Sequence, residues 1–93
     1  MQKEKIIHLI DGKEAGYIVY LWNEKGNLQP IHTIAHEEYK GQGVGKQLFQ
    51  QLLDLADEKG VKIYPVCPFV VKTFRKHPEL HHYLEEGYEF PAE

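Results

Sequence analysis

The chain is short of several residue types, and each shortage excludes a class of protein. Its 93 residues include one cysteine, so no disulfide can form within the chain, as is usual in a reducing compartment. The apolar runs are too short to span a membrane. The polar start at 1–5 is followed by no apolar segment of the kind that a signal peptide needs. We therefore expect a cytoplasmic protein without a membrane partner.

Positive charge is in short supply as well. Lys and Arg total 11 against 14 Asp and Glu, which gives a net charge of −3 and no basic stripe for a nucleic acid. The acidic pair Glu85-Glu86 is interpreted as a solvated face, the usual place of such a run. Hydrophobic residues make up 42% of the chain, which suits a folded domain, and a chain of this length has room for one core. The sequence therefore predicts a single domain over 1–93.

The first third of the chain has the short β-branched and aromatic runs that are typical of strands. Strands are predicted over residues 5–10, 14–22 and 28–35. Turn residues at 11–12 and 23–27 join these strands closely, as in hairpins. The pattern therefore indicates an antiparallel meander of three strands.

The spacing of apolar residues then changes to that of a helix. Residues 44–59 carry one apolar stripe, formed by Val44, Leu48, Leu52 and Ala56. Gly60 stands where a left-handed residue commonly ends such a helix. A fourth strand is predicted over 61–66. A strand, a helix and a strand in succession imply a right-handed crossover and a parallel pair.

Prolines mark the elements of the C-terminal part. Pro68 can open a helix that runs to about 77, and Pro78 disfavours the helical conformation of the residue before it. Pro78 can itself open a last short helix through 86, which Gly87 ends. The predicted fold class is therefore α+β. It has a four-stranded, mostly antiparallel sheet, in which the meander is followed by a strand–helix–strand crossover and short C-terminal helices.

The most informative motif is the glycine-rich run Lys40-Gly41-Gln42-Gly43-Val44-Gly45-Lys46, between a predicted strand and a predicted helix. Backbone N–H groups in the first turn of a helix have no partner inside it and lie at the positive end of its dipole, so this turn can hold a phosphate. The alternative is a plain connection. A plain connection does not need three glycines in five residues, because each loses much conformational entropy when it is ordered.

Two common phosphate motifs do not fit this run. A P-loop needs glycine in place of Lys40 and Ser or Thr in place of Gln47, and a dinucleotide fingerprint needs glycine in place of Lys46. The pattern that fits is Arg or Gln, two residues of any kind, Gly, one residue of any kind, then Gly or Ala. The stretch from Lys40 to Gly45 matches it except at the first residue. This stretch resembles the acetyl-coenzyme A loop of the GNAT superfamily of N-acetyltransferases.

The rest of the chain is similar to the same family. The order of meander, glycine loop, long helix, strand and further helix matches, so the resemblance covers nearly the whole chain. The stretches His32-Thr33 and Val66-Cys67-Pro68-Phe69-Val70 resemble its small single-domain branch, called YjdJ-like. The resemblance implies transfer of an acetyl group from acetyl-coenzyme A, the donor cofactor, to a primary amine on a small molecule or a peptide.

The resemblance also implies where the coenzyme binds. The loop amides would cradle its pyrophosphate, and its pantetheine arm would pair with the exposed edge of the third strand like an added strand. The implied cofactor-binding residues are Thr33, Ile34, Ala35, Lys40, Gly41, Gln42, Gly43, Val44, Gly45 and Lys46. Lys72 and Arg75 are further cations that can meet the coenzyme phosphates.

Cys67 is the leading candidate for a catalytic residue. It directly precedes Pro68, near the start of a predicted helix whose dipole favours a thiolate. A thiolate can accept the acetyl group as a thioester, and the resemblance to the YjdJ-like branch implies a catalytic cysteine at this place. Two alternatives stay open. The thiol can line the acetyl pocket while the amine attacks directly, or it can be a small buried side chain without a role.

Acid and base residues are harder to place. Many members of the family have a proton-donating tyrosine in the helix after the fourth strand, but the corresponding residue here is Phe74, which has no hydroxyl. A second register places that tyrosine pattern at 83–88 instead. His32 can deprotonate an ammonium group near neutral pH, or it can be an ordinary polar residue on a strand. The final hairpin of larger relatives is missing, so the acceptor site is either open or completed by the second subunit of a homodimer.

The histidines and the cysteine lack the paired spacing of a zinc site, so no metal is expected. Three functions therefore stay open. The chain is an acetyltransferase, a module that binds coenzyme A or an acylated partner without turnover, or an interaction domain that binds no coenzyme.

Overall fold

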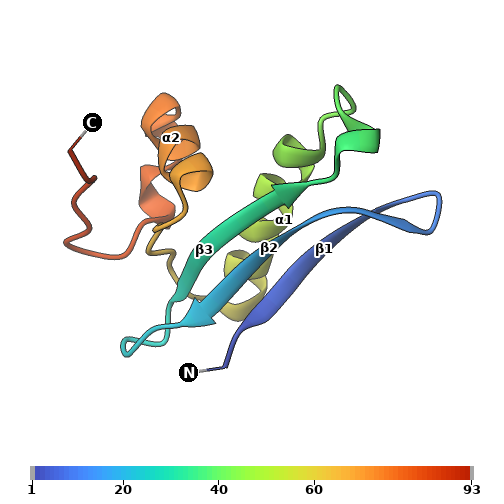
Figure 1. Ribbon diagram of the computed structural model, residues 1–93. Coiled ribbons are helices and arrows are strands. Elements are labelled where there is room, and N and C mark those ends of the chain that lie inside the picture. The colour runs from blue at the N-terminus through green and yellow to red at the C-terminus, as the bar shows by residue number, and fades with distance from the viewer. Residues whose placement is uncertain (1, 93) are drawn as a thin grey trace.

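Three strands pair side by side in chain order in the computed structural model, which describes residues 2–92 (Figure 1). They are β1 (Glu4–Ile10), β2 (Lys13–Trp22) and β3 (Leu28–Ala35), and both strand pairs are antiparallel. Each strand lies within one residue of its predicted bounds. The predicted meander is therefore confirmed.

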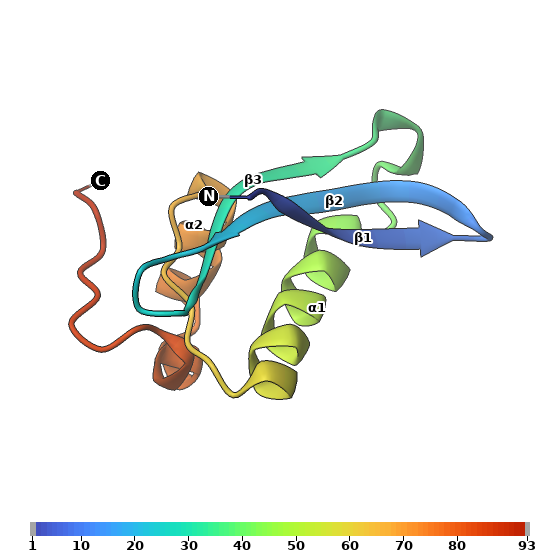
Figure 2. The same cartoon turned by 90° about the horizontal axis from the view of Figure 1, so that it is seen from below.

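A single long helix covers one face of this sheet. After β3 the chain passes through a short 3-10 helix, η1 (Glu37–Tyr39), and enters α1 (Val44–Lys59), which ends at Gly60 as predicted. The apolar stripe of α1 is buried against inward-facing residues of the strands such as Ile6 and Ile18. Figure 2 shows α1 on one side of the sheet, and large apolar side chains on the other side, those of Ile7, Leu9 and Ile34, are exposed. The core is therefore one layer thick, and the sheet has one covered and one uncovered face.

Gly16 on β2 allows α1 and β3 to approach the sheet closely. A Cβ atom at this position would lie 2.5 Å from the carbonyl oxygen of Ile34 and 2.7 Å from a methyl carbon of Val44. Both distances are shorter than any ordinary contact between these atoms. Gly16 is therefore required where β3 and the first turn of α1 meet.

The predicted fourth strand over 61–66 is wrong in its extent, because only one parallel bridge joins this segment to β3, between Leu28 and Ile63. The Tyr64 N–H donates to the Leu28 carbonyl at 2.7 Å, which keeps the predicted parallel direction. In a regular ladder the next bond would run from the N–H at position 30 to the Tyr64 carbonyl. Position 30 is Pro30, which has no N–H, so the ladder stops.

Beyond Pro30 the two segments separate. The N–H groups of Val66 and Cys67 both donate to the Pro30 carbonyl, at 3.1 and 3.0 Å, and the chain then enters α2 (Pro68–Lys76). Within residues 2–92, no backbone hydrogen bond joins 31–35 to this segment. The C-terminal half of β3 is therefore a free sheet edge that faces the start of α2 (Figure 1).

The last predicted helix is present but shorter than predicted. It is a 3-10 helix, η2 (Pro78–Tyr83), instead of a helix through 86. A turn follows it, in which the Tyr88 N–H donates to the Glu85 carbonyl at 2.9 Å. Ile63 forms a second parallel bridge, with Leu84, so the C-terminal part of the chain runs beside the segment that precedes α2.

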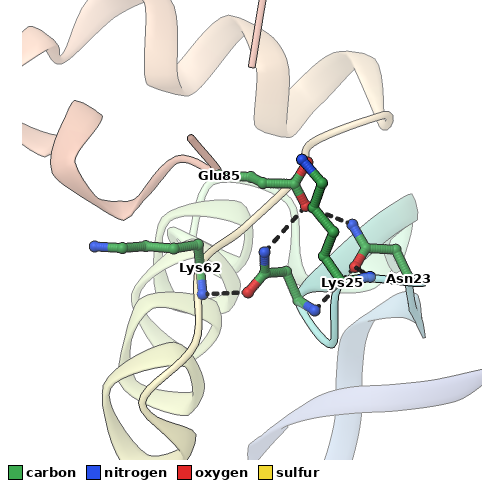
Figure 3. Close-up of polar contacts among 5 residues, drawn as sticks. Asn23, Lys25, Lys62 and Glu85 are labelled. Carbon is green, nitrogen blue, oxygen red and sulfur yellow. Dashed lines mark hydrogen bonds and ion pairs between the residues drawn. The ribbon is translucent and has the colours of Figure 1, made fainter. Parts of the chain in front are cut away.

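The interpretation of Glu85 as part of a solvated face is wrong, because Glu85 is only 8% exposed. Its Oε1 accepts hydrogen bonds from the side-chain amides of Asn23 at 2.7 Å and Asn27 at 3.0 Å (Figure 3). The ammonium of Lys25 lies 3.7 Å from Oε2. Asn27 in turn accepts the backbone N–H of Lys62 at 2.9 Å. These contacts attach the C-terminal segment to the β2–β3 turn.

We expect the Glu85→Gln variant to be less stable, by an amount that depends on pH. Hydrogen bonds from Asn27 and Asn23 and the charge of Lys25 hold the pKa of Glu85 below its ordinary value of 4.5. The stabilisation is therefore complete above that value and is lost as the pH falls through the lower pKa of the folded protein. Urea unfolding should show a loss of about 1–3 kcal/mol near neutral pH, and the loss should shrink as the pH falls below the lowered pKa of Glu85. The exposed neighbour provides the control, Glu86→Gln, and equal losses in both variants would contradict the assignment.

Candidate functional site

The first turn of α1 presents backbone donors without protein acceptors. Its N-cap is Gly43, which has a left-handed φ of 72° and no side chain to cap the helix. The first helical bond runs from the Gln47 N–H to the Gly43 carbonyl at 3.0 Å, so the amides of Val44, Gly45 and Lys46 precede it and have no acceptor within the helix. No acidic residue lies in this turn. The turn is therefore electropositive and suits an anion.

The loop before α1 is held by the backbone of η1. The Lys40 N–H donates to the Glu37 carbonyl at 3.0 Å, and the Gln42 N–H donates to the Tyr39 carbonyl at 3.1 Å. Added Cβ atoms at Gly41 and Gly43 would meet nothing within 4 Å. The surface of the loop is therefore open, and a ligand can approach its backbone.

A groove of about 720 Å³ runs between α1 and α2, beside the glycine-rich loop. Its lining is partly apolar, with Phe49 and Phe69 among the residues, and it includes three lysines, Lys46, Lys72 and Lys76, against one carboxylate residue, Glu79. Such a groove suits a long ligand with both apolar and anionic parts. Arg75, by contrast, donates to the carbonyl of Pro91 and is committed to the C-terminal segment.

Phe69 of α2 packs against the start of α1. A Cβ atom at Gly45 would lie 3.0 Å from the tip of the Phe69 ring, so the third glycine of the loop makes room for this contact. In the sequence Phe69 carries only part of the family resemblance and has no predicted role in the site, because only the fold brings the first turns of the two helices together. The ring therefore helps to fix the distance between the loop and α2.

Cys67 lies where the free edge of β3 faces α2. It is the N-cap residue of α2, is 4% exposed, and its carbonyl accepts the Val71 N–H at 2.9 Å. Its sulfur lies 3.2 Å from the hydroxyl oxygen of Thr33, so the two groups share a hydrogen bond. Two of the predicted site residues are therefore in direct contact, through the Thr33 side chain.

His32 is not part of this contact. Successive side chains of a strand point to opposite faces, so the neighbour of Thr33 points away from the cysteine. His32 is exposed, and its backbone pairs in register with Val19 on the uncovered face of the sheet. The structure therefore places His32 and the sulfur of Cys67 on opposite sides of β3.

The helix α2 contains no tyrosine, and the nearby Tyr88 uses its hydroxyl in a hydrogen bond. Phe74 is fully buried, with its ring edge-on to Phe49 at a centroid distance of 5.0 Å. The Tyr88 hydroxyl donates to the Pro65 carbonyl at 2.9 Å, and burial raises the pKa of Tyr88. The Tyr64 ring, which sequence reasoning missed, packs edge-on against Tyr88. This pair anchors the segment that ends at Cys67.

Two further observations concern the described residues 2–92. No helix among them is both long enough and apolar enough to span a bilayer. They also contain no cluster of three or more His, Cys, Asp or Glu side chains that is arranged to hold a metal ion.

Comparison with known proteins identifies relatives of this fold. The family model for GCN5-related N-acetyl-transferases matches residues 6–84. A crystal structure of a ribosomal-protein-alanine N-acetyltransferase from Brucella melitensis biovar Abortus 2308 is similar, with a TM-score of 0.63 and 24% sequence identity. That match covers 98% of this chain and 67% of the other. An acetyltransferase from Trypanosoma brucei matches with a TM-score of 0.47 and 16% identity, over 98% of this chain and 67% of the other. No curated protein matches the chain. The predicted fold class is thereby confirmed.

Proposed function

This chain belongs to the family of GCN5-related N-acetyltransferases, and we propose that it carries an acetyl group from acetyl-coenzyme A to a primary amine. The resemblance to the GNAT superfamily is confirmed, whereas the YjdJ-like branch stays a prediction. The observation that carries the proposal is the open first turn of α1, whose amides have neither a helical acceptor nor a side-chain cap. Its donors and its lack of carboxylates fit a pyrophosphate.

The proposed coenzyme site extends on both sides of this turn. The segment 40–46 holds the pyrophosphate, and Lys46 adds a positive charge beside it. Two further lysines that line the groove, Lys72 and Lys76, would supply positive charge for other phosphate contacts. The pantetheine arm pairs with the backbone of 33–35, since β3 has an unpaired edge there. This path leads the thioester into the gap between β3 and the start of α2, where Cys67 is buried.

Two routes for the acetyl group remain compatible with this geometry. In the first, the amine attacks the thioester directly and Cys67 lines the pocket. In the second, the Cys67 thiol gives up its proton, its sulfur bonds to the acetyl carbon, and coenzyme A leaves as the thiol that carries this proton. An amine then attacks the acetyl-cysteine, and the amine proton restores the thiol. The hydrogen bond with Thr33 holds the sulfur in place for either route.

The second route predicts an acetyl adduct on Cys67. After incubation with acetyl-coenzyme A and no amine, intact-protein mass spectrometry should detect one added acetyl group, which the Cys67→Ala variant should lack. A thermal melt of the variant checks that it is folded, since it removes one small buried side chain. An adduct that persists in Cys67→Ala would assign the acetyl group to another residue. Free-thiol release across a panel of small amines, polyamines and peptides would then identify the acceptor.

Phe74 favours a second candidate function, a module that binds coenzyme A without turnover. No hydroxyl of α2 is available at this position to protonate a leaving thiolate. A coenzyme that raises the melting temperature, with no thiol released in the presence of any amine, would support the module. Failure of coenzyme A to shift the melting temperature, at concentrations far above micromolar, would contradict both candidates.

A further inference from the structure

The uncovered face of the sheet is unusually apolar for a face exposed to water. Antiparallel sheets with one solvated face normally place polar side chains on it. Here the outward-facing positions of the three strands include Ile7, Leu9, Tyr17, Val19, Leu21 and Ile34. Three of them are large and well exposed, Leu9 at 57%, Ile7 at 44% and Ile34 at 40%. Apolar side chains that are exposed side by side on one face make that face a candidate for an interaction site. We call the side of the sheet that carries these six residues the outer face.

The strand register arranges the outer face in rows. The central row runs across all three strands, from Ile7 through Tyr17 to Ile34. The row on one side begins with Lys5, whose ammonium lies 4.4 Å from the centre of the Tyr17 ring. The row on the other side pairs Leu9 with Glu14. A positive and a negative group therefore flank the apolar row at opposite ends of the face.

The negative end is fixed in place. The Glu14 carboxylate lies 2.6 Å from a ring nitrogen of His36, and the His36 ring is tilted against Tyr17. Both groups are partly exposed, at 41% and 37%. The carboxylate therefore stays on the outer face and is accessible to a partner.

We propose that the outer face binds a second copy of this chain, about a two-fold axis that runs across the strands along the central row. This operation stacks the Ile7, Tyr17 and Ile34 row on its own copy and reverses the strand direction of the partner. Each Lys5 then lies opposite the partner's Leu9 and beside its Glu14, and each Glu14 lies opposite the partner's Val19 and beside its Lys5. Apolar contact at the centre and opposite charges at both ends make the face complementary to itself.

The size of the face sets the expected strength of the dimer. Three strands spaced about 4.8 Å apart, over about six residues each, give a footprint of roughly 14 by 20 Å. This is well below the roughly 800 Å² that each partner buries in a standard interface. We therefore expect a reversible dimer that forms at about 100 μM or above, independently of acetyl transfer.

Charge-swap variants test both the surface and the orientation. Sedimentation equilibrium from about 10 μM to about 1 mM should show the wild-type chain associating, and Ile7→Glu should be monomeric throughout. Lys5→Glu and Glu14→Lys should each weaken association about tenfold, because each places like charges beside one another. The double variant should regain the wild-type dissociation constant.

The control is Glu58→Lys, which makes the same charge change on the exposed side of α1 and should leave association unchanged. Circular dichroism melts check that every variant is folded. A wild-type chain that is monomeric up to about 1 mM would overturn the proposal. Association that survives in Ile7→Glu, or a double variant as weak as the single ones, would also overturn it.

Discussion

Replacement of Gly43 by aspartate is expected to weaken coenzyme A binding about 100-fold while leaving the fold intact. The new carboxylate would stand beside the free amides of Val44, Gly45 and Lys46, where it competes for their hydrogen bonds and repels a pyrophosphate. Aspartate tolerates the left-handed conformation of this position better than most residues, and a negative charge at a helix N-terminus stabilises the helix by about 0.3–1 kcal/mol. The net change in stability should therefore be small.

Gly43→Asn is the matched control for this prediction. Asparagine has a similar size and a similar tolerance of left-handed φ, but it carries no charge. Isothermal titration with coenzyme A should show a loss of less than about tenfold for asparagine and about 100-fold for aspartate. Equal affinities in the two variants would mean that the loop does not hold an anion, and the proposed function would then lose its main support.

The Gly16→Ala variant is expected to lose more than about 3 kcal/mol of unfolding free energy. The new Cβ atom would lie 2.5 Å from the Ile34 carbonyl oxygen, which cannot retreat without disturbing the pairing of β2 with β3. It would also press on Val44, the first residue of α1, at 2.7 Å. A small domain has about 5–15 kcal/mol in total, so the melting temperature should fall by more than about 12 °C.

Gly12→Ala separates crowding from backbone strain. Gly12 lies in the β1–β2 turn with a φ of 78°, and a Cβ atom there would meet nothing within 4 Å. The cost of alanine is then limited to its left-handed conformation, about 1–2 kcal/mol. Urea unfolding of both variants provides the measurement. A Gly16→Ala variant as stable as Gly12→Ala would show that the crowded position can relax, contrary to the argument from packing.

The elements that follow from local patterns could be predicted from the sequence. The strands of the meander and the whole of α1 are encoded by side-chain period and by nearby turn residues, and they lie where predicted. The segment 61–66 could not be predicted from its own residues, although they favour a strand. Its ladder depends on the partner strand, in which Pro30 has no donor to continue the pairing.

The candidate site divides in the same way. The open first turn of α1 follows from a glycine-rich run before a helical stripe, a local pattern. The contact between Thr33 and Cys67 joins residues 34 positions apart and has no local signal. The environment of Glu85 is equally non-local, since its amide partners lie 58 and 62 positions away in the β2–β3 turn. An adjacent pair of glutamates gives no indication of which one the fold will bury.

The missing N–H of Pro30 has a consequence for the energetics of ligand entry. A gap that is closed by a hydrogen bond must be opened before a ligand can use it, and the lost bond then reduces the affinity. Here Pro30 has no N–H, so the hydrogen bond that would close the gap between β3 and the segment before α2 cannot form. The gap is therefore preorganised at every temperature and pH at which the chain is folded. An amide-bearing ligand along β3 can therefore form its own bonds with the strand without displacing any.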